Sequence, residues 1–464
     1  MTAKTSLQGA IAVTRLGLGA RPGEIAAASA DPKGWVLDQI TPMGAPPYWP
    51  EMPSAATRFI QFAAARQERR TAAAAAAKTG QPAPDPVVQI RALIRQDAGV
   101  DFLRRIQFAA ATDAGFQERW ALFWSNHFTV SGLKPQAANL IGPFEQEAIR
   151  PHVFGKFEDM LVASSTHPAM LLYLDQAQSI GPNSRAAAFL ARSGRKPGLN
   201  ENLGREILEL HTVGVEAGYS QADVTEFARA LTGWSLAGPN MPDREGQFLF
   251  RPNAHEPGVR AVMGRRYADD GYFQGHRILH DLAVSPHTAH HLATKIARHF
   301  VSDTPPDSLV QTLKAAYLRS EGDLGEVARA LVGAPETWDP SPVKFKTPYE
   351  FVVSSARIGG GFGARPERIG PVLASMGQRP FAAPSPKGWP DDAASWADGD
   401  DVFKRLSWSD SYARQVIAER DPMALADAAL GPRLSPLAGR TIARAETRGE
   451  GLAILLMTPE FQRR

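Results

Sequence analysis

Apolar side chains recur every three or four residues over most of this chain, which is the spacing of an amphipathic α-helix. Alanine-rich stretches of this kind run from Ile25 to Arg119. Similar patterns predict two or three helices over residues 115–170, another over about 285–301, and more through most of 307–361 and up to the C-terminus. The sequence therefore predicts a mainly α protein built from many helices.

Three segments depart from the helical period. Residues 79–86 (TGQPAPDP) predict a proline-rich loop, which is the best internal break in the chain. Residues 246–268 contain two short runs rich in aromatic and β-branched side chains, and these predict a small β-hairpin with a long tip. Residues 376–396 hold too many prolines for a helix and predict a long ordered loop. Because no internal repeat accompanies these breaks, we expect residues 1–464 to form a single large domain.

The composition narrows the classes of partner and cofactor. The chain has 51 basic and 48 acidic residues and a formal net charge of +3, so nothing indicates a nucleic-acid binder. It has no cysteine, which excludes disulfides, thiolate metal sites and cysteine nucleophiles. No apolar stretch approaches the roughly 20 residues that span a bilayer, and no signal peptide is recognisable. We expect a soluble protein without a membrane span, cytoplasmic by default, with export alongside a partner as the alternative.

The most distinctive predicted helix covers residues 200–213. At about 100° per residue, Leu203, Ile207 and Leu210 share one apolar stripe. The other side carries a charged ladder at positions i, i+4 and i+8, which consists of Glu201, Arg205 and Glu209. Such a ladder is typical of salt bridges on a helix surface. Arg205 is also a candidate substrate-binding residue and Glu209 a candidate catalytic residue.

Glu206 differs from the acids of this ladder. Its neighbours one turn away are Asn202 and Leu210, so no cation within the helix neutralises it. A carboxyl group at the border of the apolar face is partly buried, which raises its pKa and suits general acid/base catalysis. Glu209 projects from the same side, so the two acids are placed to share a proton or bind a cation. An arginine supplied to Glu206 by another helix is the structural alternative.

Two histidines are candidates for proton transfer. His127 lies among large aromatic side chains, where Asn126 is placed to orient a substrate and Trp124 to contact it. His211 falls on the apolar side of the 200–213 helix, away from its acids. For both rings, burial with a hydrogen bond to a backbone carbonyl is the structural alternative.

Three further residues complete the predicted substrate site: Trp234, His255 and Trp389. His255 lies at the tip of the predicted hairpin, where a side chain is exposed by default. Trp389 lies in the loop at 376–396, which we expect to cover a cleft. By contrast, residues 220–223 (SQAD) match a capping box, so Asp223 is assigned to helix initiation.

Several segments together resemble the bacterial family called domain of unknown function 1800. The longest and most distinctive is NENLGREILELHTVGVEAGYSQADVTEFARALTGW at residues 200–234. Shorter segments agree in order along the chain, namely FWSNHF (123–128), HPAMLLYLD (167–175), HEPG (255–258), SPHTAHHLATKIARHFV (285–301), KFKTPYEFV (344–352) and GQRPFAAPSPKGWP (377–390). The resemblance covers nearly the whole chain, from about Ala10 to Gln462.

This resemblance implies a helical fold but no established chemistry. Relatives are often encoded beside an exported protein similar to alkaline phosphatases and sulfatases, which implies that protein as a partner. Our leading hypothesis is a hydrolase or lyase that acts by acid/base chemistry on an envelope-related polar substrate such as a glycan, with Glu206 as the acid/base group and His127 as the second proton carrier. A non-catalytic binding or maturation role for that partner is the second hypothesis. The third is a divalent metal held by Glu206, Glu209 and His127.

Overall fold

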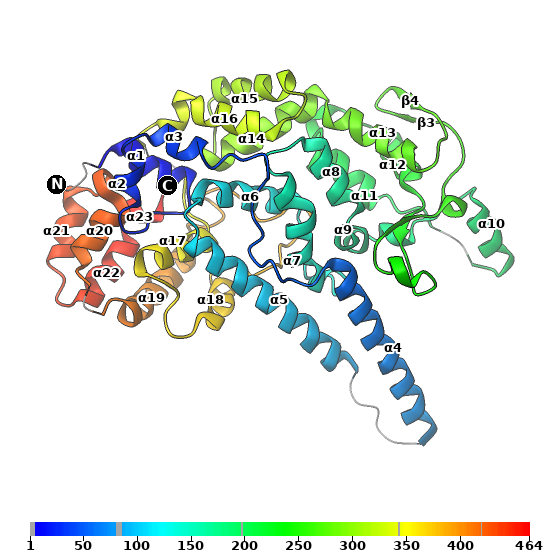
Figure 1. Cartoon of the computed structure of the whole chain (residues 1–464), viewed down its shortest axis with the longest axis horizontal. Helices are drawn as coiled ribbons and strands as arrows, with labels where there is room; N and C mark the ends of the chain where they lie inside the picture. The colour runs from blue at the N-terminus through cyan, green and yellow to red at the C-terminus, as the bar shows by residue number, and fades with distance from the viewer. Residues whose placement is uncertain (1–4, 80–85, 196–197, 342–343, 419) are drawn as a thin grey trace.

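The chain folds into an elongated, mainly helical body, described by a computed structural model (Figure 1). The structure describes residues 5–79, 86–195, 198–341, 344–418 and 420–464. In the first half, the helices are α1 (Leu7–Ile11), α2 (Glu24–Ala28), α3 (Pro32–Leu37), α4 (Ala55–Thr79), α5 (Pro86–Ala111), α6 (Gly115–His127), α7 (Ile141–Phe144), α8 (Phe157–Thr166), α9 (Pro168–Tyr173), α10 (Arg185–Arg192), α11 (Asn202–Glu206) and α12 (Gln221–Leu231). In the second half they are α13 (Tyr272–Ala283), α14 (Pro286–Phe300), α15 (Asp307–Arg319), α16 (Leu324–Gly333), α17 (Pro348–Gly359), α18 (Ile369–Ser375), α19 (Gly399–Val416), α20 (Pro422–Leu430), α21 (Pro436–Ala443), α22 (Arg448–Met457) and α23 (Pro459–Gln462). The predicted mainly α fold is confirmed.

Helix starts follow local sequence signals. Ser220 and Asp223 form the predicted capping box at the start of α12. Ser285 caps α14 with Pro286 at its first position. These contacts satisfy backbone N–H groups that the first turn of a helix leaves without partners.

Helices α4 and α5 project from the body as a long arm (Figure 1). A buried ion pair fixes the base of the arm: Arg58 on α4 donates to both carboxylate oxygens of Asp101 on α5, at 2.5 and 2.7 Å. Arg58 also donates to the carbonyl of Asn139 at 2.8 Å. The predicted loop at 79–86 falls between these helices, and its residues 80–85 lie outside the described part of the chain.

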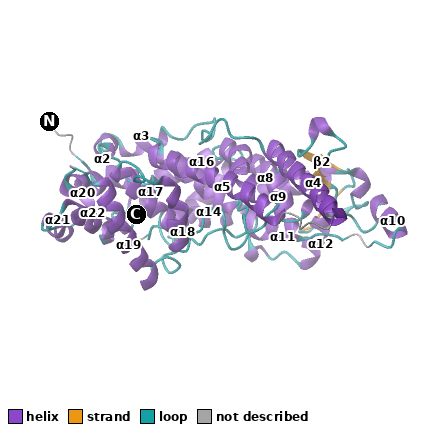
Figure 2. Ribbon diagram, turned by 90° about the horizontal axis from the view of Figure 1, so that it is seen from below, coloured by secondary structure: helices purple, strands orange, loops and turns teal. Residues whose placement is uncertain are grey.

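The predicted hairpin at 246–268 is wrong in its pairing. Strand β2 (Phe248–Phe250) pairs with β1 (Trp234–Leu236), which lies outside the predicted segment. The second pair is a short hairpin of β3 (Arg260–Val262) and β4 (Arg265–Tyr267), in antiparallel register. Each sheet therefore has two strands, and Figure 2 shows strand near the α12 end of a body that is otherwise helix and loop. The aromatic run at 248–250 was correctly assigned to a strand, but its partner strand lies before it in the chain.

The hydrophobic core divides into two large clusters of buried side chains. One surrounds α6, α8 and α14, with Trp120 and Trp124 fully buried at its centre. The other joins α5 and α17 to the C-terminal helices α19, α20 and α22. The first cluster packs beneath the end of α6, where the candidate site lies. Among the described residues, none of the helices is both long enough and apolar enough to cross a bilayer.

Candidate functional site

A cavity of about 580 Å³ lies where α5, α6, α14 and the start of α17 meet the loop at 376–396. Three of the predicted site residues line it: Asn126, His127 and Trp389. Its wall also carries many charged side chains, namely Arg105, Arg119, Lys295, Arg298, Asp303, Glu350, Arg379, Lys387, Asp391 and Asp392. A cavity therefore lies at the end of α6, and its lining combines three of the predicted residues with many charged side chains that the sequence did not indicate.

Asn126 holds the covering loop in place. Its Oδ1 accepts a hydrogen bond from the Trp389 backbone N–H at 2.8 Å, and its Nδ2 donates to the Trp389 carbonyl at 3.0 Å. Gly388 lies against the same residue at φ +85°, where an added Cβ would fall 2.5 Å from the Asn126 carbonyl oxygen. A side chain at 388 is therefore excluded both by backbone conformation and by space. Asn126 serves here as a loop clamp, in addition to lining the cavity.

His127 is buried and makes two hydrogen bonds that fix its tautomer. Nε2 lies 3.1 Å from the backbone carbonyl of His211, and Nδ1 lies 2.9 Å from Nζ of Lys295. A carbonyl can only accept, so Nε2 carries the proton and Nδ1 accepts from Lys295. Burial, with the nearby Lys295 charge, holds the pKa of His127 well below its usual value. The ring is therefore neutral at physiological pH.

The 200–213 segment supports this histidine through its backbone. The segment is α-helical over α11 and then forms a π-helix, Ile207–His211. The carbonyls at its end accept from two imidazoles: His127 bonds that of His211, and His291 on α14 bonds that of Leu210 at 3.1 Å. The π turn thus directs two carbonyls toward α6 and α14. A π-helical turn inside an α-helix is frequently found at functional sites.

The π turn also corrects the predicted faces of this helix. Leu203 and Ile207 are buried as expected, but Leu208 is buried where Leu210 was predicted, and Leu210 is half-buried. Each π turn takes in one residue more than an α turn, since its hydrogen bonds span i to i+5. The i, i+3, i+4 pattern therefore fails after Ile207.

His211 and Trp124 are core residues. His211 is 1% exposed, and neither of its ring nitrogens has a hydrogen-bond partner. Burial and the neighbouring Lys295 and His291 lower the pKa of His211 to about 3. Trp124 is fully buried against His127, at 5.3 Å between ring centroids. Neither His211 nor Trp124 lines the cavity.

Lys295 is a half-buried cation on the cavity wall without a partner acid. No described carboxylate lies within ion-pair distance of its Nζ. Burial, opposed by Asp391 and reinforced by Lys387 and Arg298, lowers the pKa of Lys295 to about 8. Arg298, Arg379 and Lys387 also line the cavity, with exposed side chains. This side of the cavity is consequently electropositive.

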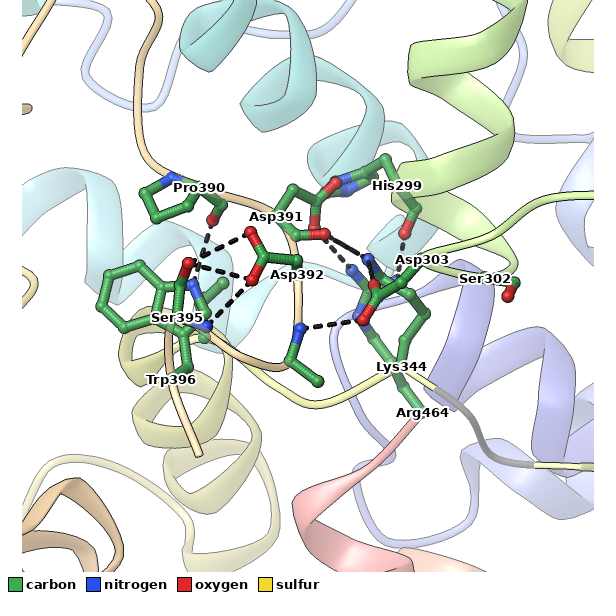
Figure 3. A network of polar contacts seen from close by, with 12 residues as sticks. His299, Ser302, Asp303, Lys344, Pro390, Asp391, Asp392, Ser395, Trp396 and Arg464 are labelled. Carbon is green, nitrogen blue, oxygen red and sulfur yellow. Dashed lines mark hydrogen bonds and ion pairs between the residues drawn. The ribbon is translucent and has the colours of Figure 1, made fainter. Parts of the chain in front are cut away.

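His299 lies one turn beyond Lys295 on α14 and forms a dyad with Asp391 of the covering loop. Nδ1 donates to Oδ2 of Asp391 at 2.7 Å (Figure 3). Nε2 of His299 is buried and has no hydrogen-bond partner. Burial lowers the pKa of His299, although Asp391 acts in the opposite direction. A carboxylate that fixes one ring nitrogen and leaves the other unoccupied is the arrangement of a histidine general base.

A buried charge network holds Asp391 in position. Lys344 lies 3.4 Å from Asp391 and 2.5 Å from Asp303, and Arg464 lies 3.7 Å from Asp391 (Figure 3). Arg464 also contacts Glu350 at 3.2 Å and donates to the carbonyl of His299 at 2.7 Å. Burial acts to raise the pKa of Asp391, but His299, Lys344 and Arg464 together lower it, so the carboxyl group is ionised at neutral pH.

The acids of the 200–213 segment lie outside this cavity. Glu206 is half-buried, and burial with the neighbouring Glu209 raises its pKa as expected. Arg205 pairs with Glu201 at 3.1 Å, whereas Glu209 accepts from the Tyr219 hydroxyl at 3.4 Å instead of completing the ladder. None of these four charged side chains lines the cavity with His127. The structure thus separates the two groups that the leading hypothesis combined.

His255 and Trp234 also lie away from the cavity. His255 is 7% exposed, and its Nδ1 donates to the Thr232 carbonyl at 3.0 Å, so the expectation of an exposed ring is wrong. The reason is that the adjoining Glu256 accepts from the backbone and side chain of Asn183, which ties this turn to the segment before α10. Trp234 is fully buried on β1.

The residues needed for a metal site do not converge. Within the described ranges, no group of three or more histidine, aspartate and glutamate side chains is placed to hold a metal ion. In particular, His127 lines the cavity while Glu206 and Glu209 do not.

Sequence reasoning missed Lys295, His299 and Asp391. The first two lie one turn apart on α14, an amphipathic helix whose charged residues look like an ordinary solvated face. Asp391 follows Trp389-Pro390 in the loop that was expected to cover the cleft. The sequence did offer one signal for them: Lys295 and His299 stand at positions i and i+4 of a predicted helix, and Asp391 is an acid in the predicted covering loop.

Comparison with known proteins gives a match to a protein family. The profile of the family described as "Protein of unknown function (DUF1800)" matches residues 11–463. No curated protein and no solved structure matches the chain. Because the match spans nearly all of the 464 residues, this chain belongs to the family Protein of unknown function (DUF1800).

Proposed function

We propose that this protein is an acid/base enzyme that acts on an anionic substrate in the cavity. The observation that carries the proposal is the His299–Asp391 dyad, one helical turn from the unpaired cation Lys295 on the same wall. His299 serves as the general base through Nε2, which is buried here and reaches a substrate after a local rearrangement exposes it. Asp391 orients the ring and stabilises its protonated form. Glu206, the base first expected from the sequence, has no place in this mechanism.

The charge of the wall supports an anionic substrate. Lys295, Arg298 and Lys387 have no described acid partner, so a ligand carboxylate, sulfate or phosphate would satisfy them. Trp389 and Phe381 supply apolar surface on the covering loop. A polar, acidic and ring-containing ligand fits both features, and an acidic glycan from the cell envelope belongs to that class.

Between hydrolysis and elimination, the geometry favours a lyase reaction. Cations that neutralise a substrate carboxylate acidify the adjacent C–H bond, and a neutral histidine is then a sufficient base to remove that proton. A hydrolase acting on a glycosidic bond ordinarily uses two carboxyl groups on either side of that bond. Of the four acids on the cavity wall, Asp303, Glu350 and Asp391 are each engaged by a cation. The fourth, Asp392, accepts from the Ser395 backbone and hydroxyl.

A screen of acidic oligosaccharides and sugar acids tests this proposal. Product formation by the full chain, measured as new carbon–carbon double bonds or reducing ends, should fall by at least about a hundredfold in His299→Gln. His287→Gln provides the matched control, because His287 is exposed on the same helix and should retain wild-type turnover. Equal turnover of the His299→Gln protein on any substrate that the wild type converts would remove the proposed base.

A second candidate function is a binding or maturation role for an exported protein similar to alkaline phosphatases and sulfatases. The projecting arm of α4 and α5 favours it, because Gln67, Glu68 and Arg70 are exposed on a helix that extends away from the body (Figure 1). Co-purification of the two proteins should then depend on the arm and persist in His299→Gln. Loss of co-purification in His299→Gln, with the arm intact, would argue against this role.

A further inference from the structure

We propose that Lys295 is a nucleophile whose ε-amine forms an imine with a carbonyl group of the anionic substrate. This inference rests on the proposed function, because it uses the same cavity and the same anion-binding wall. It narrows the substrate to a carbonyl acid, such as a 2-oxo acid or the open-chain form of a sugar acid. Arg298 and Lys387 would hold the acid group while Lys295 attacks the carbonyl carbon.

Lys295 differs in its contacts from the two fully buried lysines, Lys344 and Lys346. Lys344 is committed to Asp303 and Asp391, at 2.5 and 3.4 Å. Lys346 donates to Ser354 at 3.0 Å, lies over the Phe461 ring, and does not line the cavity. Lys295 lines the cavity and has His127 as its one recorded side-chain partner in the described structure. An ammonium group held by an acid stays protonated, whereas a lysine without one can become a free amine.

The contact with His127 orients the amine for attack. Nδ1 of His127 is an obligate acceptor, because its Nε2–H is committed to the His211 carbonyl at 3.1 Å. One N–H of Lys295 therefore points toward His127 at 2.9 Å. The lone pair of the neutral amine then points away from His127, and the cavity is the open side.

The environment of Lys295 also favours the neutral amine. Its pKa is lowered to about 8 by burial, with Lys387 and Arg298 adding like charge. At pH 7.5, such a lysine carries roughly two-hundredfold more free amine than an ordinary lysine. Desolvation and a neighbouring cation are the two recognised means by which proteins activate a lysine nucleophile.

The reaction balances without any further reactant. The amine nitrogen attacks the carbonyl carbon, and the C=O π electrons move to oxygen, which takes up a proton as the nitrogen loses one. The resulting carbinolamine then loses its hydroxyl group as water, and the nitrogen lone pair forms the C=N bond. Lysine and carbonyl compound thus give an imine and one water molecule, with no change of oxidation state. His299, one turn away on α14, is placed to move the protons.

Reductive trapping on the full chain tests the inference. The protein is incubated at pH 7.5 with glyoxylate or pyruvate and cyanoborohydride, and modified lysines are mapped by peptide mass spectrometry. We expect Lys295 to be modified at least about tenfold faster than Lys314 on α15, which serves as an internal reference outside the cavity. Acetaldehyde, which has no acid group, should lose most of this preference. In Lys295→Arg, the adduct on the corresponding peptide should disappear while circular dichroism shows the native helical content.

The outcomes separate this inference from the proposed function. Modification spread evenly over the lysines, with pyruvate or glucuronate still bound to the cavity by NMR titration, would overturn the imine and leave the anionic acid/base site standing. Failure of both trapping and binding would remove both. Trapping at Lys295 that persists when His299→Gln has full turnover would support the imine and remove the proposed base.

Discussion

The side-chain amide of Asn126 makes two hydrogen bonds with the backbone of Trp389, in the way that one β-strand bonds to its neighbour. One hydrogen bond runs in each direction, at 2.8 and 3.0 Å, between the end of α6 and the loop at 376–396. This loop carries Asp391, the partner of His299. One asparagine therefore links the wall of the cavity to the segment that supplies the proposed dyad.

Replacing Asn126 with alanine should release the covering loop. The change removes both hydrogen bonds and leaves the N–H and C=O of Trp389 without partners, at a cost of about 2 kcal/mol for local opening. Hydrogen exchange of the Trp389 amide should then accelerate roughly thirtyfold. Asn240→Ala is the control, because Asn240 is exposed in a turn far along the chain from the loop. Unchanged exchange at Trp389 in Asn126→Ala would show that other contacts hold the loop.

Replacing Asp391 with asparagine should destabilise the whole fold. The carboxylate lies among His299, Lys344 and Arg464, and its neutralisation removes one of the two acids that face each buried cation, leaving Asp303 for Lys344 and Glu350 for Arg464. Breaking a buried ion pair from one side costs about 3–5 kcal/mol. The free energy of unfolding, from urea titration, measures the effect. The adjacent Asp392→Asn is the matched control: Asp392 accepts only from Ser395 in the described structure, so we expect a loss of about 1 kcal/mol.

Helix content and helix starts were accessible from the sequence because they depend on local signals. The capping box of Ser220 and Asp223 formed as predicted, since its two hydrogen bonds lie within four residues. The pairing predicted for the 248–250 run failed for the opposite reason, although the short hairpin of β3 and β4 does lie within 246–268. β2 pairs with the earlier strand β1, with Ser235 opposite Leu249. The alternation of side chains within β2 does not show which other strand it pairs with, because that strand is separated from it by a loop.

Only part of the candidate site could be predicted from the sequence. His127 could be identified because an imidazole among aromatic residues is unusual at the end of a helix. Its partner Lys295 is 168 residues away, and a lysine on an amphipathic helix looks like a solvated charge until the fold places it. The π turn at 207–211 is likewise invisible to a periodicity argument. That turn, and not an α-helical face, decides that the backbone carbonyl of His211, rather than its ring, forms the hydrogen bond with His127.

The buried histidines should make the protein acid-labile. His127, His211 and His291 all have lowered pKa values, to about 3 for His211 and about 4 for His291. Below pH 6.5 the unfolded chain binds protons at these rings while the folded chain does not, so stability falls as the pH falls from 6.5 toward 4. Each ring contributes roughly 1 kcal/mol per pH unit in this range.

Comparison of His211→Phe with the wild type isolates one of these contributions. His211 makes no hydrogen bond through its ring, so phenylalanine removes the titration without leaving a partner unsatisfied. Between pH 7 and pH 5, the variant should lose about 1–2 kcal/mol less unfolding free energy than the wild type, measured by urea titration. His287→Gln should follow the wild type, because that ring is exposed. Equal losses in His211→Phe and wild type would mean that His211 is protonated in the folded protein.

The charged form of Lys295 should lower the free energy of unfolding of the protein. Its pKa in the folded protein is about 8, against 10.5 for an ordinary lysine, so the fold disfavours the charged form. Between these two values the unfolded chain binds more protons than the folded chain, and stability therefore rises with pH from about 8 to 10.5. Below pH 8 both states are charged, and the full penalty for the buried ammonium remains.

Lys295→Met removes that charge with little change of side-chain length. At pH 7 the variant should be more stable than the wild type by about 1–2 kcal/mol, after allowance for the hydrogen bond lost by His127 and for solvent screening at a half-buried site. At pH 10.5 the advantage should vanish, because the wild-type lysine is then neutral in the folded state. Thermal unfolding at both pH values measures the difference, and Lys314→Met, at a half-buried position of α15 outside the cavity, controls for the loss of a lysine charge. If the variant were less stable than the wild type at pH 7, the fold would be stabilising the Lys295 ammonium. That result would contradict the lowered pKa of Lys295, and with it the free amine on which imine formation depends.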